Sequence, residues 1–466
     1  MELMNLLSDV AIPVYGGTFD VSLNWLGTLI KNLILGVGSV GLGIILFSVI
    51  LKVIVLPFDV YQRIGMRKQN LKMKENQAKM EKLQKQYAND KQMYNQKVME
   101  MYKESGFSMF SSCLPMILSM VIFIVAINAF NAFAQYSNIE NYNTMVEAYN
   151  AKIEYYCADL DGENTSVTVD GTKVVVKETG DNKYIYYTMS APAANVPFAT
   201  QEEKIAYVNS VDWKEKSYYI DKTLALENPE IQEFVNARGE EGVTEDAALV
   251  SYFEDKAQDA VVEVYHKEDG VLEHMSFLWI KNIWATDASY KHPVLGYEDF
   301  KTEVSREEFQ VGEEEMKLAD MTSYTNAYSD VVYEKVTGKL DEQKGQANGY
   351  FVLIVLSVGT ILLQQFVSMR SQKEQQKYSS VDGQGGSQQK MMMIIMTAMF
   401  AIFSFMYSSA FSIYMIMSNV LSLISTLVIN KIVDIRSAKK ETAALQAKYN
   451  QRFPRTAQDN KKNKKK

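Results

Sequence analysis

One lysine lies inside a long apolar run, where an ionisable side chain is costly to bury. Lys52 is the only charged residue between positions 33 and 57. Gly41, Ser48 and Lys52 share one face of a helix, because positions three, four and seven residues apart lie on the same side. Charged residues at such a depth usually face water or a partner and mark a pathway for polar groups. Lys52 could therefore attract and solvate an anionic group inside a membrane. The alternative is that its long stem carries the ammonium to the nearby water interface.

Polar side chains also occur in the other apolar runs. A space shared by several helices and filled with water would solvate these groups together with the Lys52 ammonium. The alternative for the serines is hydrogen bonding between neighbouring helices. The apolar runs contain no Asp or Glu, so we expect Lys52 to have no acidic partner within the membrane. The predicted hydrophilic groove contains Lys52, Ser48, Ser119, Asn128, Asn419 and Ser422.

Motifs for bond-making catalysis are missing from the sequence. It has no phosphate-binding glycine loop, no nucleophile elbow and no pair of carboxylates at catalytic spacing. His266, His274 and His292 do not have the spacing of zinc ligands. We therefore predict no enzymatic activity, no metal site and no cofactor.

Four apolar runs are long enough to hold these residues in membrane helices. About 20 residues cross a hydrocarbon core of roughly 30 Å at 1.5 Å per residue. The last run, residues 391–430, is long enough for two crossings, which the polar triplet Tyr407-Ser408-Ser409 would separate. The sequence predicts five spans, at residues 33–57, 109–135, 348–370, 391–407 and 410–430.

The distribution of charge predicts the orientation. Residues 58–107 hold 11 Lys/Arg and 6 Asp/Glu, a balance of +5, and residues 431–466 hold 12 and 3, a balance of +9. Residues 134–345 hold 19 and 42, a balance of −23. Basic flanks stay in the cytoplasm, although long loops carry little weight in this rule. With five spans, the N-terminus and the acidic segment are expected outside and the C-terminus inside.

A helical hairpin is predicted in the cytoplasm between the first two spans. Residues 63–87 and 91–105 are rich in helix formers, and Ala88-Asn89-Asp90 between them is typical of a turn. Methionines recur every seven residues and suit adaptable contacts. The alternative is a solvated stalk without a partner. The side chains predicted to contact a substrate are Met73, Met80, Leu83 and Met101.

The segment before the first span is amphipathic. Trp25, Leu26, Leu29 and Ile30 recur at helical spacing. A helix lying in the outer membrane interface would place Trp25 at the depth of the head groups. The alternative is that these residues extend the first span.

The acidic middle and the basic tail carry their own predictions. Residues 165–176 are typical of a β-hairpin with an Asp-Gly turn, and residues 244–265 of a helix, which together favour a small α+β domain. The terminal lysines are Lys461, Lys462, Lys464, Lys465 and Lys466. Such a run binds phosphate-rich surfaces, and ribosomal RNA or anionic lipid head groups would both fit. An unattached disordered tail is the alternative.

Several short motifs follow one another in a specific order. They are Leu51-Lys52-Val53-Ile54-Val55-Leu56-Pro57, Met101-Tyr102-Lys103-Glu104-Ser105-Gly106, Cys113-Leu114-Pro115, Phe277-Leu278-Trp279-Ile280 with Asp287, and Ser412-Ile413-Tyr414 with Ser418-Asn419. In this order they resemble the YidC/Oxa-type membrane insertases. The matching stretches cover somewhat less than half of the chain.

The resemblance implies a function and a set of partners. It implies a five-helix core whose hydrophilic groove opens to the cytoplasm and to lipid, and which inserts transmembrane segments and helps them to fold. Lys52 stands at the position of the family's groove arginine, and lysine keeps the charge but lacks the guanidinium fork. Ser119 stands where the family often has glutamine, and Met415 where it often has tryptophan. The implied partners are nascent membrane proteins and the lipid bilayer, with the ribosome and the general translocation channel as further candidates.

The predicted fold is an all-α polytopic membrane protein with a five-helix insertase core and a cytoplasmic helical hairpin, plus an α+β extracytoplasmic insertion domain, in a cell membrane. Two alternative functions remain: a polytopic transporter, and a membrane sensor with an external ligand-binding domain. Outside the five spans, the predicted segments are an extracytoplasmic N-terminus with the interfacial helix (1–32), the hairpin (58–108), the insertion domain (136–347), a cytoplasmic loop (371–390) and the basic cytoplasmic tail (431–466).

Overall fold

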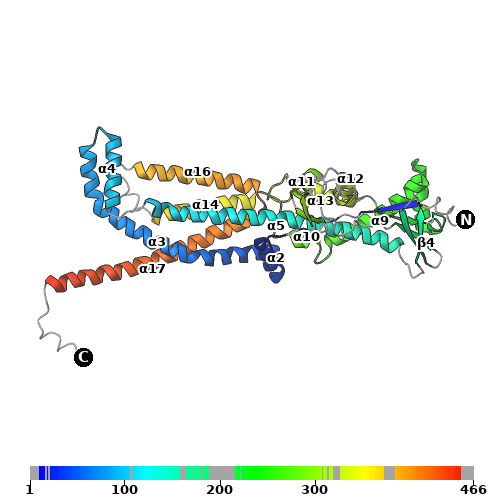
Figure 1. The fold of residues 1–466 in the computed structure, drawn as a ribbon, viewed down its shortest axis with the longest axis horizontal. Coiled ribbons are helices and arrows are strands. Elements are labelled where there is room, and N and C mark those ends of the chain that lie inside the picture. The colour runs from blue at the N-terminus through cyan, green and yellow to red at the C-terminus, as the bar shows by residue number, and fades with distance from the viewer. Residues whose placement is uncertain are drawn as a thin grey trace, which may run out of the picture. The chain divides into compact units, whose positions relative to one another are not determined.

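Long helices form most of this protein (Figure 1). The computed structural model describes residues 10–15, 18, 21, 23–104, 109–157, 164–169, 172–179, 182–187, 216–220, 222–306, 308–311, 314–317, 326–371 and 384–452. The chain divides into two compact units. The first unit comprises Met1–Gly43, Asn128–Val352 and Phe405–Ala410, and the second comprises Ile44–Ile127, Leu353–Ser404 and Phe411–Lys466.

A short helix precedes the first span. Helix α2 (Trp25–Val37) begins where the Asn24 side chain accepts a hydrogen bond from the Gly27 amide, and it ends at Gly38, whose φ is +71°. The next helix starts only at Val40. A left-handed residue of this kind terminates a helix, so α2 does not extend the first span. The predicted start of that span at residue 33 therefore falls inside α2. Trp25 is 77% exposed, as an interfacial helix would require.

The first span and the first arm of the hairpin are one helix. Helix α3 (Val40–Gln86) runs through 47 residues and contains Pro57 without ending there. Residues 87–89 form a turn, and Asp90 accepts a hydrogen bond from the amide of Met93 at the start of helix α4 (Lys91–Glu104). Helix α4 runs back beside the end of α3 (Figure 1). The predicted helical hairpin is confirmed, with its turn at the predicted place.

The second predicted span is part of a much longer helix. Helix α5 (Met109–Cys157) continues 22 residues past the predicted end at position 135. Its later part buries Ile139, Tyr142, Val146, Tyr149 and Ile153, at intervals of three and four residues. The polar residues after position 134 resembled the end of a span, but this buried stripe continues the helix within the first unit.

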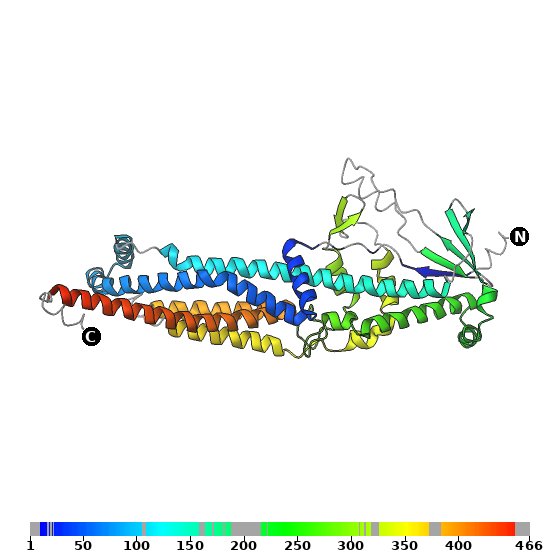
Figure 2. The ribbon, with the colours of Figure 1, turned by 90° about the horizontal axis from the view of Figure 1, so that it is seen from below.

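The first unit contains a five-stranded antiparallel sheet (Figure 2). The register pairs Val169 with Thr172, which confirms the predicted β-hairpin. The N-terminal strand is also held to α5, because Asn150 accepts a hydrogen bond from the Tyr15 amide and donates one to the Tyr15 carbonyl (2.9 and 2.6 Å). In spatial order the strands are β1 (Val10–Val14), β5 (Lys216–Ile220), β4 (Asn182–Tyr187), β3 (Thr172–Thr179) and β2 (Asn164–Val169).

Short helices and a small two-stranded sheet complete the first unit. Thr244 caps helix α9, which confirms the predicted helix over residues 244–265. The elements are α7 (Lys222–Ala225), α8 (Pro229–Glu240), α9 (Glu245–His266), α10 (Val271–Met275), α11 (Tyr297–Val304), β6 (Glu308–Val311), β7 (Glu314–Lys317), η3 (Asn326–Tyr328), α12 (Asp330–Val336), η4 (Gly338–Leu340) and α13 (Asp341–Gly345).

Aromatic side chains form the core that joins these helices to α5. The rings of Tyr142, Phe300 and Tyr333 pack in a triangle with centroid distances of 4.6, 5.0 and 4.6 Å. The Tyr142 hydroxyl donates to the carbonyl of Ala327 at 2.7 Å. Aromatic pairs of this kind contribute about 0.5–1.5 kcal/mol each beyond the burial of their area. The core therefore comes from α5, α11 and α12.

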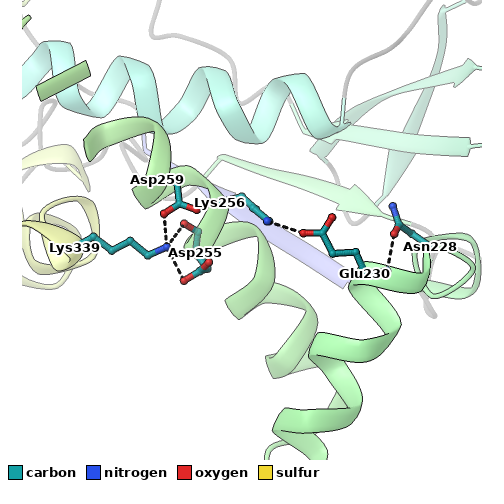
Figure 3. Close-up of polar contacts among 6 residues, drawn as sticks. All are labelled: Asn228, Glu230, Asp255, Lys256, Asp259 and Lys339. Carbon is teal, nitrogen blue, oxygen red and sulfur yellow. Dashed lines mark hydrogen bonds and ion pairs between the residues drawn. The ribbon is translucent and has the colours of Figure 1, made fainter. Parts of the chain in front are cut away.

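Ion pairs connect α9 to its neighbours at the surface. Lys339 contacts Asp255 and Asp259 of α9 (2.8 and 2.5 Å), and Lys256 of α9 contacts Glu230 of α8 at 2.6 Å (Figure 3). Exposed pairs of this kind contribute about 0–1 kcal/mol. They set the orientation of α9 more than they stabilise it.

A buried carboxylate fixes the segment that leads into the third span. Asp287 is fully buried, and its Oδ1 accepts a hydrogen bond from the Tyr350 amide at 2.7 Å, while its carbonyl accepts one from Phe351 at 3.1 Å. A Cβ on Gly349 would lie 1.9 Å from that Oδ1, so only glycine fits there. Two residues before Asp287, the Ala285 carbonyl accepts hydrogen bonds from the amide and hydroxyl of Ser409 (2.9 and 2.8 Å).

The second unit packs the remaining apolar helices, α14 (Val352–Ser371), α16 (Gln384–Met406) and α17 (Ser409–Arg452). Ser357 and Ser404 share a hydrogen bond of 2.9 Å between α14 and α16. Phe123 of α5 packs on Phe400 and Phe411 at centroid distances of 4.9 and 5.6 Å. The predicted turn around residue 408 separates α16 from α17.

Helix α17 continues well past the predicted end of the last span at residue 430. It reaches Arg452, two residues before Pro454, so more than half of the basic tail is helical (Figure 2). Ala, Lys, Glu and Gln, which are good helix formers, are frequent in this stretch. The five terminal lysines lie outside the described residues.

Among the described residues, four helical segments are long and apolar enough to cross a membrane. They carry exposed large apolar side chains, such as Val53, Val355 and Phe366, as lipid-facing surfaces do. Of the predicted fourth span, the described residues contain a shorter apolar stretch, Thr397–Met406, so the count of five remains a prediction. The four segments are Val40–Tyr61, Val121–Ile153, Val352–Arg370 and Ser409–Ile432.

Candidate functional site

Lys52 lies at the centre of a polar contact between two spans of the second unit. Its Nζ is 2.6 Å from Oδ2 of Asp59 on the same helix and donates a hydrogen bond to Oγ of Ser422 on α17 at 3.0 Å. The side chains of Lys52 and Asp59 are 15% and 27% exposed. A charge-assisted contact at this distance is stronger than one between neutral groups. The ammonium is therefore held in place between α3 and α17.

The expectation that Lys52 has no acidic partner is wrong. Asp59 lies just past the predicted end of the span at Pro57, but the first candidate span extends to Tyr61. Residues seven apart are two turns of one helix apart and share a face, so a lysine stem can reach the carboxylate. The spacing of Lys52 and Asp59 was the signal in the sequence. Treating Pro57 as the boundary concealed it.

The neighbouring polar groups differ in how they are satisfied. Ser48 is buried, and its hydroxyl donates to the carbonyl of Ile44 at 2.8 Å, so its own helix satisfies it. Ser425 donates to the carbonyl of Ser422 at 3.1 Å. The Nδ2 of Asn419 is buried and has no hydrogen-bond partner among the described residues. Since Asn419 and Ser422 are three residues apart, they share one face of α17.

This arrangement can exchange one anion for another. The Lys52 ammonium has a carboxylate and a hydroxyl as partners, and the Asn419 amide adds an unused donor on α17. An acidic group of a substrate could take the place of Asp59 beside the Lys52 ammonium, and the displaced Asp59 carboxylate, which is 27% exposed, would then turn to water. Breaking the ion pair without replacing it would be costly. The chemistry that fits the site is therefore reversible binding of an anionic or strongly polar chain segment.

A comparison with protein families decides which family this is. The family model described as "60Kd inner membrane protein" matches residues 32–200 and 264–440, which is 169 plus 177 residues of 466. The match contains Lys52, Asp59, Asn419 and Ser422. The chain belongs to this family. The YidC/Oxa resemblance is thereby confirmed, and the chain is a multi-pass membrane protein.

Curated relatives agree with the family model. The chain is 38% identical over 98 residues to "Membrane protein insertase YidC" of Caldanaerobacter subterraneus subsp. tengcongensis, covering 21% of this chain and 46% of the relative. It is 38% identical over 86 residues to the protein of the same name from Fusobacterium nucleatum (18% and 40%). A third relative of that name, from Streptomyces avermitilis, is 28% identical over 142 residues (28% and 29%). The chain thus spans less than half the length of these relatives. No solved structure matches it.

Four of the six predicted groove residues belong to one compact unit of this YidC/Oxa family member. Lys52, Ser48, Asn419 and Ser422 lie in the second unit. Asn128 is exposed on α5 and belongs to the first unit. The Ser119 side chain lies outside the described residues. Asp59, which the prediction omitted, takes part in the site.

Of the hairpin side chains predicted to contact a substrate, those that the structure describes are buried or half-buried. Met80 is 2% exposed, Met101 is also buried, and Leu83 is half-buried. The Met73 side chain lies outside the described residues. Met93 and Met99 of α4 are exposed instead. These two thioethers, which the seven-residue spacing did not select, are available to a partner in this conformation.

Proposed function

We propose that this protein is a membrane protein insertase and chaperone, which inserts transmembrane segments into the bilayer and helps them to fold. The observation that carries the proposal is the mostly buried ammonium of Lys52, held between Asp59 and Ser422. Membership of the family supports it, as does the name of the curated relatives. The same comparisons give no support to a transporter or a membrane sensor.

The proposed mechanism lowers the barrier for moving a short polar tail across the membrane. The polar groups around Lys52 line a hydrophilic groove, and together with water they replace part of the tail's hydration. The adjoining apolar helix of the substrate then moves into lipid past α14 and α17. Partitioning of that helix drives the reaction, at about −0.3 to −0.6 kcal/mol for each central Leu, Ile, Phe or Val. No bond is made or broken, so the protein is not an enzyme.

The proposed topology follows the charge distribution. The hairpin and the basic C-terminal segment lie in the cytoplasm, where the exposed face of α4 receives nascent membrane proteins first. The N-terminus and an α+β insertion domain over residues 136–347 lie outside. The basic end of α17 and the lysines after it would bind phosphate groups of the ribosome or of lipids. Contact with the general translocation channel belongs to the same proposal.

Reconstitution tests this function directly. The full chain is placed in liposomes without other translocation machinery, and a single-span substrate is synthesised in their presence. We expect a protease-protected substrate fragment with these liposomes and little or none with empty ones. Equal protection in both preparations would contradict the proposal. Uptake of a small solute without protection of the substrate would favour the transporter instead.

The ion pair of Lys52 leads to a second expectation. Because the Asp59 carboxylate competes with an acidic substrate tail for the Lys52 ammonium, Asp59→Asn should raise the initial insertion rate of such a substrate about 3- to 10-fold. A substrate with a neutral tail should change much less. The rates are measured in the same liposomes at equal protein levels.

Asp299→Asn is the matched control for Asp59→Asn. It also removes one carboxylate from an ion pair with a lysine, in this case Lys291 on the surface of the first unit. We expect it to leave both substrates unaffected. A lower rate for the acidic tail in Asp59→Asn would show that Asp59 assists binding rather than competes with it.

A further inference from the structure

A cavity of about 430 Å³ lies in the first unit, outside the Lys52 site. It is bounded by the end of α9, the loop after α10, and α13, which bring together parts of the chain about 80 residues apart. The polar residues that line it include Tyr265, Trp279, Lys281, Gln343 and Gln346. Its volume is in the range of small-molecule sites, which is about 300–1,000 Å³. It is large enough for one compact polar group.

Three side chains that line this cavity have a buried polar atom without a partner. They are the hydroxyl of Tyr265, Nε1 of Trp279 and Oε1 of Gln343, which form no hydrogen bond among the described residues. Burial raises the pKa of Tyr265, so its hydroxyl stays protonated and can donate. Native proteins satisfy most buried polar groups, because an unsatisfied one costs about 1–3 kcal/mol. Three such atoms around one cavity indicate an occupant that supplies both acceptors and a donor.

The charge in the cavity is positive on one side. Lys281 is half-buried, and its Nζ hydrogen-bonds to Oε1 of Gln346, a neutral amide. Within the described part of the chain no carboxylate lies at ion-pair distance from this ammonium. Gln346 in turn donates at 2.8 Å to the carboxylate of Glu342, which lines the cavity on its other side. The Lys281 ammonium, the indole N–H of Trp279 and the hydroxyl of Tyr265 together are suited to bind the oxygens of a phosphate group.

The residue beside Trp279 projects an apolar side chain into the surroundings. Leu278 is 72% exposed and has a φ of +56°, a conformation that is strained for leucine. Backbone hydrogen bonds between Phe277 and Ile280 (2.9 and 3.0 Å) close this turn and hold it. A strained turn that keeps leucine in solvent suggests contact with lipid.

The cavity is also close to the membrane along the chain. Gln346 is six residues before Val352, where α14 begins to cross. Six extended residues span at most about 20 Å, so the cavity lies within that distance of the start of the span. Tyr350, between them, is 65% exposed. Phospholipid is therefore the phosphate compound closest to this cavity.

We propose that this cavity binds the head group of a membrane phospholipid. The phosphodiester accepts hydrogen bonds from Lys281, Trp279 and Tyr265, and a hydroxyl or ammonium of the head group donates to Gln343. The acyl chains of the lipid extend out of the cavity past the exposed side chain of Leu278. This binding does not depend on the insertase function, since no step of insertion uses the cavity.

Binding is tested on the full-length protein in detergent, with dihexanoyl phosphatidylglycerol as the probe and titration calorimetry as the readout. Loss of a charged partner should weaken binding about 10- to 100-fold in Lys281→Gln, and loss of the indole N–H about 3- to 10-fold in Trp279→Phe, which keeps the ring. Lys291→Gln is the matched control, because Lys291 pairs with Asp299 away from the cavity. It should bind as the unmodified protein does.

Two further probes identify the source of the phosphate. Dihexanoylglycerol, which has no phosphate, should not bind, and sn-glycerol 3-phosphate should bind at least 10-fold more weakly than the lipid. Equal affinity for the free phosphate would overturn the assignment to lipid. Unchanged affinity in Lys281→Gln and Trp279→Phe would overturn the site itself. Gln343→Ala on the short helix α13 provides a third variant, and thermal unfolding verifies that each variant is folded.

Discussion

Replacing Lys52 with alanine should reduce insertion of a single-span substrate with an acidic outer tail by about 10-fold or more. A hydrogen bond to a charged group contributes about 1.5–3 kcal/mol, and each 1.4 kcal/mol is a factor of ten in rate. The variant also leaves Asp59 in the span without its cation. That carboxylate would then repel the acidic tail, so the loss should exceed the loss for a neutral tail. Insertion is measured in liposomes at equal amounts of protein.

Two variants separate the charge of Lys52 from its effect on Asp59. Lys52→Arg keeps the cation and should retain most of the activity, since the resemblance to the YidC/Oxa family implies an arginine at this position. Lys52→Ala combined with Asp59→Asn removes both charges, so it should relieve the repulsion of acidic tails by Asp59 without restoring a preference for them. Full activity of Lys52→Ala at normal protein level would refute the role of the cation. Loss of activity in Lys52→Arg would refute a role based on charge alone.

The site was partly predictable because a charged residue within a long apolar run can be recognised in the sequence. A lysine in an apolar run stands out by its cost, and the spacing of Asn419 and Ser422 places both on one helical face. Asp59 was missed because a proline usually ends a helix, whereas Pro57 lies inside α3. Asn128 was included because it lies in an apolar run, and its place in the groove stays a prediction.

The fold was predictable where one pattern acts over a short range. The hairpin turn, the helix capped by Thr244 and the strand pair around Asp170-Gly171 all follow from local signals. The length of α5 could not be predicted in this way, because its later half is packed against rings from α11 and α12, which are far away in sequence. The cavity beside Trp279 could not be predicted from the sequence for the same reason. Its walls come from three segments whose proximity only the fold establishes.

Asp287→Ala should lower the midpoint of thermal unfolding by roughly 5–15 °C. The carboxylate is fully buried and accepts the amide of Tyr350 at the entrance to α14. Its removal leaves that amide unsatisfied and opens a gap beside Gly349, at a cost of about 2–4 kcal/mol. One kcal/mol corresponds to about 2–4 °C in a unit of roughly 150–250 residues that unfolds cooperatively. Unfolding is followed in detergent by intrinsic fluorescence.

A conservative replacement and a surface control test whether the loss of stability comes from the buried carboxylate itself. Asp287→Asn keeps an oxygen at the same place and should lose less than half as much, because an amide oxygen still accepts from Tyr350. Asp299→Ala breaks the surface pair with Lys291 and should shift the midpoint by no more than about 2 °C. Equal losses in Asp287→Ala and Asp299→Ala would mean that the entrance to α14 does not depend on this carboxylate. Since Ala285 and Asp287 bind Ser409 and Tyr350 from one short segment, a specific loss in Asp287→Ala would show that this segment anchors the connections that lead into α14 and α17.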